Sequence, residues 1–287
     1  MKSPRFCLLA TMVLSVGCIQ QAPTGVVYTQ PPTATIESSG GVNRGAVPQP
    51  TAPGGGSRIR VLHASPDSMA SNVTIYLDNA AAPVIPSIRY RQSVGYQEAS
   101  AGAHSVQVRL PGFAADSPPV LSWSTPAFQP GRSYTVIAHG LASELAGPPV
   151  SFAPVEDLGE APAPGVAQLR FFNALVGANS VDLCTAQSVA FQSVRYGTWG
   201  TTQVPGAVGR YIPGPPGAAT FVVRLGGAGA PCSGQPVGTA QVMLQGGSNA
   251  TLVAVGRIGR PAVATELLQC TDAPVPGATA CTAVPLR

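Results

Sequence analysis

Charged and aromatic residues are scarce in this sequence. Only 10% of the 287 residues are Asp, Glu, Lys or Arg, 6% are aromatic, and Lys2 is the only lysine. The formal net charge is +4, and the basic residues are scattered along the chain. Because nucleic-acid binding depends on basic residues gathered into a patch, we expect no nucleic-acid partner.

Motifs of metal and phosphate chemistry are also missing. The three histidines are His63, His104 and His139, and no H-x-x-x-H or C-x-x-C spacing occurs. The glycine-rich stretches GGAGAP and GPPG lack the lysine and the strand-to-helix setting of a phosphate loop. We therefore predict no metal site and no cofactor.

One short stretch, HASPD, carries His63, Ser65 and Asp67 and could suggest a catalytic triad. On an extended strand these neighbours would lie about 7 Å apart. A nucleophile and its base need about 2.6–3.2 Å. Pro66 makes Ser-Pro-Asp a favourable turn, so we predict a strand that ends in a turn and no catalytic residues. A hydrolase that uses His63, His139 and Asp67 is the less favoured alternative.

Glycine and proline are abundant, with 33 and 30 residues. Both interrupt helices, so their number favours short strands joined by turns. Apolar residues also recur at every second position, as at Val106, Val108 and Leu110. This period is typical of strands with one face on a core, and it predicts an all-β protein.

The N-terminus has the form of a signal peptide, residues 1–17. A basic start is followed by an apolar run of about 11 residues, too short to span a bilayer. The following LSVGC resembles the lipobox of bacterial lipoproteins, although Ser15 stands where leucine is usual. The resemblance implies that Cys18 is lipidated and anchors the protein to a membrane. Ile19 after this cysteine favours the outer membrane, and a plain secretory signal is the alternative.

Residues 18–57 follow as a tether rich in Pro, Thr, Gln, Ser and Gly. Such a segment buries too little apolar surface to offset its ordering entropy, so we expect it to be disordered. As a flexible coil it would span about 35 Å. It would hold the folded part away from the membrane.

The rest of the chain repeats itself. SIRY at 87–90 returns as SVRY at 193–196, and GRSYTVIAHG at 131–140 returns as GSNATLVAVG at 247–256. A repeat of this length indicates two tandem copies of one domain. We expect each copy to be a β-sandwich of about seven strands. The expected boundaries are 58–152 for the first domain, 153–165 for a stiff linker, 166–260 for the second domain and 261–287 for a tail.

The segments RIRVLHASPDSMASNVTIYLDN, AGAHSVQVRLPG and GRSYTVIAHG resemble the bacterial family called domain of unknown function 4397. The resemblance implies an immunoglobulin-like β fold and a secreted or surface location, often as a lipoprotein. It implies no activity. The second copy, LRFFNALVGANSVDLC, lacks the HASPD element.

Four cysteines remain after Cys7 leaves with the signal and Cys18 is lipidated. They are Cys184, Cys232, Cys270 and Cys281. An even number in an exported chain predicts two disulfides. We favour Cys184–Cys232 within the second domain and Cys270–Cys281 closing a loop in the tail. The alternative is that Cys184 or Cys232 pins the tail to the domain.

Five aromatic residues could form a carbohydrate-stacking surface, but packing in the core or at sheet edges is the favoured role. They are Tyr90, Tyr96, Trp123, Tyr196 and Trp199. Taken together, the sequence predicts a lipid-anchored protein of the bacterial cell envelope. Its expected role is non-catalytic binding or structural support, with an envelope protein or a polysaccharide as partner. An accessory subunit of a periplasmic complex is the alternative.

Overall fold

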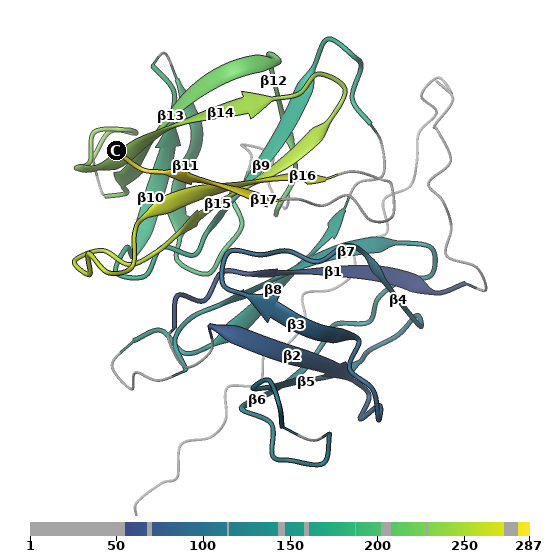
Figure 1. The fold of residues 1–287 in the computed structure, drawn as a ribbon. Coiled ribbons are helices and arrows are strands. Elements are labelled where there is room, and N and C mark those ends of the chain that lie inside the picture. Colours follow the sequence, from purple (N-terminus) through teal and green to yellow (C-terminus); the bar gives the residue numbers. More distant parts are fainter. Residues whose placement is uncertain are drawn as a thin grey trace, which may run out of the picture. The chain divides into compact units, whose positions relative to one another are not determined.

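The chain folds into strands joined by turns, as its glycine and proline content predicts. The computed structural model describes residues 55–67, 71–113, 115–142, 147–157, 161–186, 188–201, 208–227, 229–272 and 281–287. Within these ranges there are seventeen strands and no helix, so none is available to cross a membrane (Figure 1). The described residues all belong to one compact unit. The signal peptide, Cys18 and most of the tether lie outside the described residues.

The first repeat is a sandwich of two four-stranded sheets. One sheet has the order β4 (Gln97–Ala99), β1 (Ser57–His63), β7 (Ser133–His139), β8 (Ser151–Asp157). The other has the order β3 (Ile85–Arg89), β2 (Asn72–Leu77), β5 (Ser105–Arg109), β6 (Leu121–Ser124), which lie side by side in Figure 1. β1 and β7 are parallel and the other pairs in the two sheets are antiparallel.

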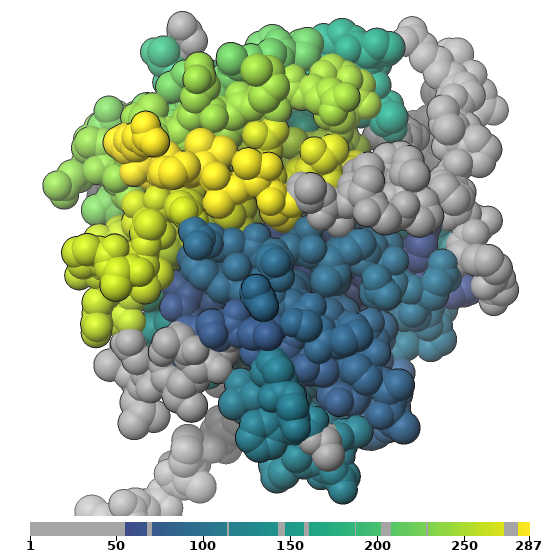
Figure 2. All heavy atoms as spheres, in the orientation of Figure 1, coloured from purple at the N-terminus to yellow at the C-terminus, as the bar shows by residue number. Residues whose placement is uncertain are grey.

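The second repeat has the same strand order with one strand added. Its larger sheet runs β12 (Ile212–Gly214), β9 (Ala167–Asn173), β15 (Asn249–Val255), β16 (Glu266–Asp272), β17 (Cys281–Pro285). Its smaller sheet runs β11 (Val189–Arg195), β10 (Ser180–Cys184), β13 (Gly217–Leu225), β14 (Pro236–Leu244). The added strand β17 lies at the surface. Its residues have the yellow colour of the C-terminal end of the bar in Figure 2. The all-β, two-sandwich architecture is therefore confirmed, with eight described strands in one repeat and nine in the other.

Each sandwich has its own apolar core, built by the alternation seen in the sequence. In the first repeat the core includes Ile59, Val73, Ile88, Val106 and Val136. In the second it includes Leu169, Val181, Phe191, Phe221 and Leu252. A third apolar cluster joins residues of both repeats: Leu62, Ala64, Ile137 and Ala153 from the first, with Phe172, Trp199, Val253 and Leu268 from the second.

This third cluster explains why some strands are buried along their whole length. β1 and β15 are buried at every residue. One face of each lies in its own sandwich core and the other face packs against the other repeat. Parallel strands that are covered on both faces have nearly continuous apolar sequences. Examples here are RFFNA at 170–174 and TLVAVG at 251–256.

The domain boundaries differ from those expected. β8 extends to Asp157, so residues 153–157 belong to the first sandwich and not to the linker. The residues 261–287 contain β16 and β17 and complete a sheet of the second sandwich. Pro154 made the end of β8 resemble a linker, but proline is tolerated in an edge strand.

Candidate functional site

The strand β1 ends at His63, as predicted, and residues 64–67 of the HASPD stretch continue the chain without regular secondary structure. The Ser65 hydroxyl donates to the Gly140 carbonyl oxygen over 2.7 Å, and the Ser65 backbone N–H donates to His63 Nδ1 over 3.3 Å. An Asp67 carboxylate oxygen accepts a hydrogen bond of 2.5 Å from the backbone N–H of Ala142. These contacts join the HASPD stretch to the loop that follows β7. In each of them the side chain forms its hydrogen bond with a backbone group.

The other two histidines occupy different environments. The His104 ring contacts the Asp78 carboxylate through Nδ1 over 2.6 Å and the Ser100 carbonyl oxygen through Nε2 over 2.8 Å. The hydrogen bond to His104 lowers the pKa of Asp78. His139 lies at the end of β7 beside Phe172 and Tyr196 of the second repeat. Burial lowers the pKa of His139 to about 4. Among the residues that the structure describes, no three His, Cys, Asp or Glu side chains are placed to hold a metal ion.

Both disulfides join the pairs favoured from the sequence. Cys184 at the end of β10 is bonded to Cys232, whose backbone N–H donates to Asp182 over 2.9 Å. Cys270 of β16 is bonded to Cys281 of β17, directly opposite it in the sheet. The first bond closes the end of the smaller sheet. The second fixes β17 to its neighbour.

The five aromatic residues pack in the interior or at its edge. Trp199 is buried, and the guanidinium carbon of Arg170 lies 4.9 Å from its ring centre. Trp123 stacks on Phe152 with ring centres 4.8 Å apart. Tyr90, Tyr96 and Tyr196 are partly buried. The prediction of packing roles is confirmed for these positions.

The strongest polar feature of the molecule is a buried charge cluster between the repeats, which we call the inter-repeat cluster. Its members are Arg60, Thr135 and Asp157 of the first repeat and Arg170, Thr251 and Asp272 of the second. Each arginine forms a salt bridge with the aspartate of the other repeat: Arg60 with Asp272 and Arg170 with Asp157. The Arg60 and Arg170 side chains are only 2% and 0% exposed.

The cluster has an internal twofold relation. Arg60 Nε donates to the Thr135 hydroxyl over 2.7 Å, and Arg170 Nε donates to the Thr251 hydroxyl over 2.8 Å. Each threonine hydroxyl then donates to the aspartate of its own repeat, at 2.7 Å for Asp157 and 2.5 Å for Asp272. The second repeat thus reproduces the contacts of the first.

Two tyrosines complete this relation. The Tyr96 hydroxyl donates to Asp157 over 2.8 Å, and the Tyr211 hydroxyl donates to Asp272 over 2.5 Å. Burial raises the pKa of both tyrosines, most strongly that of Tyr211. They therefore stay protonated and serve as hydrogen-bond donors.

The charges of the cluster stabilise one another in the ionised form. Burial opposes the charge of Arg60, but the carboxylates of Asp272 and Asp157 raise its pKa above the ordinary value. Burial likewise favours the neutral form of Asp157, but Arg170 and Arg60 lower its pKa. Two positive and two negative charges leave the cluster neutral. A buried cluster of this kind holds two surfaces in register. Because its charged form is stabilised, it has no group poised to act as a general acid or base.

The inter-repeat cluster was not among the sites predicted from the sequence. A usable signal was present, because aligning the repeats places an arginine at the third position of both RIRVLH (58–63) and QLRFFN (168–173). A charged residue at the same interior strand position in both copies is unusual, since buried charges require partners.

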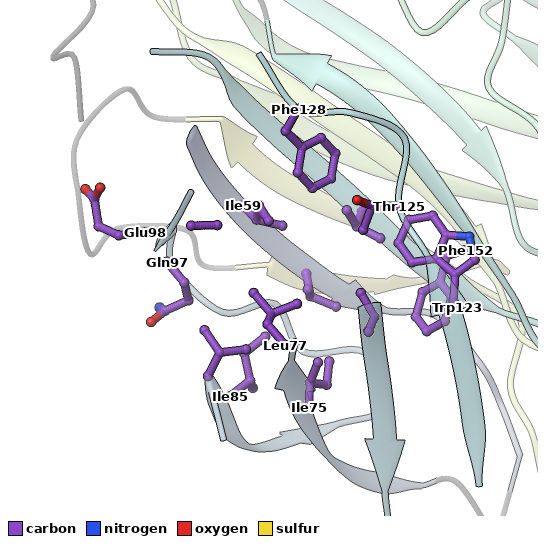
Figure 3. Close-up of a pocket in the computed structure, with 15 residues that line it drawn as sticks. Ile59, Ile75, Leu77, Ile85, Gln97, Glu98, Trp123, Thr125, Phe128 and Phe152 are labelled. Carbon is purple, nitrogen blue, oxygen red and sulfur yellow. The ribbon is translucent and has the colours of Figure 1, made fainter. Parts of the chain in front are cut away.

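The first sandwich also contains unfilled apolar space. A cavity of about 260 Å³ lies near the HASPD stretch and is bordered by Val61, His63, Ser65, Ile88 and Leu121 among other residues. A smaller gap of about 30 Å³ lies between the same two sheets and is shown in Figure 3. Its lining includes Trp123 and Phe152, whose rings lie together in that view. Val61, Ile75 and Phe152 border both spaces.

Comparison with known proteins gives one family. The family model described as "Domain of unknown function (DUF4397)" matches twice, over residues 57–184 and 167–284. No curated protein matches the chain. The second match spans the second sandwich, and the first spans the first sandwich and continues to the end of β10; together they cover most of the sequence. The chain belongs to the DUF4397 family and contains two tandem copies of its domain.

Proposed function

We propose that the protein is a lipid-anchored protein of the bacterial cell envelope that presents its two repeats as one non-catalytic binding or structural module. Cys18 would carry the lipid in the outer membrane, and residues 19–57 would act as the spacer. The two structural disulfides support this proposal, because such bonds persist mainly outside the cytoplasm.

The observation that carries the proposal is the inter-repeat cluster. Its salt bridges Arg60–Asp272 and Arg170–Asp157 are buried together with the apolar cluster around Phe172 and Ile137. Two domains joined only by a linker would be expected to move relative to each other. A buried, hydrogen-bonded interface instead favours a single fixed surface, as a binding or scaffold protein requires.

The partner would be an envelope protein or a polysaccharide. We would immobilise the full-length protein in detergent and expose it to fractionated envelope proteins and polysaccharides. The expected result is saturable binding of one fraction. A Cys18→Ala protein should bind that fraction equally well, because the proposed role of the lipid is to anchor the protein and not to contact the partner.

A second variant tests the role of the fixed interface. Arg170→Met removes the salt bridges of Arg170 with Asp157 and Asp272, and we expect weaker binding if the partner contacts both repeats. Turnover of a substrate by the folded protein would contradict the non-catalytic assignment. Absence of binding to every fraction would contradict the binding role.

A further inference from the structure

The described residues that line the cavity near the HASPD stretch are mainly apolar. This cavity lies in the first sandwich, with Val61 of β1 on one sheet and Ile75, Val108 and Leu121 on the other. Among the described residues that line it, His63 and Ser65 are polar and none is Asp, Glu, Lys or Arg. Val120 stands at its border with half of its surface exposed.

The second repeat shows why this space exists. At the position of Val61 it has Phe171, at the position of Ser65 it has Leu175, and both of these larger side chains are fully buried. The strand pairings support this alignment, because Val61 lies opposite Val136 of β7 as Phe171 lies opposite Leu252 of β15. At a third lining position, Ala142 replaces Ile258, which packs against the second core.

At the same end of the second sandwich the C-terminal segment covers part of the core, and a surface hollow of about 530 Å³ remains beside Ile258 and Leu286. Leu286, just after β17, packs against that core and lies beside Gly238 of β14. A Cβ atom at Gly238 would lie 2.7 Å from the Leu286 Cβ, so the tail occupies the space of the missing side chain. The first repeat has Leu121 at the position of Gly238 and, among its described strands, no counterpart of β17.

The two repeats therefore differ at one place in the same architecture. The second repeat fills this end of its core with Phe171, Leu175, Ile258 and Leu286. The first repeat has smaller side chains there and keeps about 260 Å³ open. Since protein interiors are normally packed to high density, unfilled space between the two sheets of the first repeat can accept a ligand.

We propose that this cavity is a binding site for a small, uncharged, apolar molecule. A dry cavity of about 150 Å³ lined by apolar side chains is large enough to bind benzene. The larger space here would accept two fused aromatic rings or a short branched hydrocarbon. The ligand would occupy the volume that Phe171, Leu175 and Ile258 fill in the second repeat.

The polar groups at the border limit the ligand's charge. The Ser65 hydroxyl already donates to Gly140, and His63 Nδ1 accepts from the Ser65 backbone. Among the described lining residues a carboxylate would find no arginine or lysine, and the one ionisable side chain, His63, already accepts a hydrogen bond at Nδ1; burying an unpaired charge is strongly unfavourable. The site should therefore reject an anion of the same shape.

The test uses the full-length protein with two probes, naphthalene and naphthalene-2-carboxylate. Binding is measured by calorimetry and by the methyl NMR signals of Ile88 and Leu121, which border the cavity. We expect saturable binding of naphthalene that shifts these signals and leaves those of Leu252 in the second core unchanged. The charged probe should bind at least tenfold more weakly.

Two variants transfer the side chains of the second repeat to the first. Val61→Phe combined with Ser65→Leu fills the cavity, and Ala142→Ile narrows it with a single change. Both should retain the fold, since the second repeat uses the same residues. We expect at least a tenfold loss of naphthalene affinity in the double variant and a smaller loss in the single one. Met243→Phe, at an exposed position of β14, should bind naphthalene as the unchanged protein does.

Three results would overturn the proposal: no naphthalene binding by the folded protein, unchanged affinity in both cavity variants, or equal binding of the two probes. This site goes beyond the proposed envelope role, and the experiment uses no envelope fraction. A negative result with naphthalene would leave the partner-binding experiment unaffected. A negative result in the partner-binding experiment would likewise leave the naphthalene test unaffected.

Discussion

The guanidinium of Arg60 in β1 forms a buried salt bridge with the carboxylate of Asp272 in β16, a residue 212 positions away in the other repeat. Arg170 and Asp157 form the reciprocal pair. The tandem repeats are thus packed by an interface in which each copy contributes the same three polar residues. This arrangement has the form of a symmetric dimer interface within one chain.

Breaking one of these pairs should destabilise the protein strongly. Arg170→Met leaves Asp157 buried without its main cationic partner, and we expect a loss of about 3–5 kcal/mol in the free energy of unfolding. Arg132→Met is the matched control, because Arg132 pairs with Glu156 at 3.3 Å on the surface with 57% of its side chain exposed. That change should cost less than about 1 kcal/mol. Equal losses in urea denaturation would refute a special role for the buried pair.

Acid should weaken the fold through His139. The pKa of this residue is about 4 in the folded protein because burial disfavours its charged form, and the ordinary value is 6.5. The unfolded chain therefore binds more protons between these values, so stability is full above pH 6.5 and falls as the pH decreases toward 4. The loss would reach about 3 kcal/mol, from about 1.4 kcal/mol for each unit of pKa difference.

His139→Phe isolates this effect. The phenylalanine ring keeps the packing beside Phe172 and Tyr196 but has no group to titrate. We expect the unfolding free energy of the variant to decrease less between pH 6.5 and pH 4 than that of the unchanged protein. Parallel pH profiles for the two proteins would contradict the assignment to His139.

The two disulfides should contribute unequally. Cys184 and Cys232 are 48 residues apart, and Cys270 and Cys281 are 11 apart. In the chain-entropy treatment the longer loop corresponds to about 4 kcal/mol and the shorter to about 3 kcal/mol. Replacing each pair with serines should therefore lower the melting temperature more for Cys184–Cys232. Mass mapping of unreduced peptides checks the pairs, and a bond between Cys184 and the tail would count against the structure.

Lipidation of Cys18 remains a prediction that a simple fractionation can test. Cys18→Ala should move the protein from the membrane fraction to the soluble fraction and abolish labelling with a radioactive fatty acid. Cys7→Ala is the control, because Cys7 lies in the segment expected to be removed. Membrane association that survives in Cys18→Ala would point to a different anchor.

Some parts of the fold were predictable because they depend on local pattern. The alternation of Val106 and Val108 with polar neighbours corresponds to β5, and Pro66 was sufficient to predict that β1 would stop near His63. The favoured disulfide pairs are present in the structure, although the sequence left open whether Cys184 or Cys232 pins the tail. The end of β8 was missed because Pro154 resembles a linker residue, whereas an edge strand accepts it.

The sequence by itself determined the strand pattern, the two copies and the expectation of two disulfides, because these follow from short-range periodicity, from similarity between segments and from an even number of cysteines. Only the tertiary structure decided which charges meet. Nothing near Arg60 in the chain indicates Asp272, since a buried charge finds its partner through packing rather than through sequence spacing. The cavity beside Val61 also could not be predicted from the sequence. It exists because side chains that are distant in sequence leave a volume between them unfilled, and only their arrangement in space shows this.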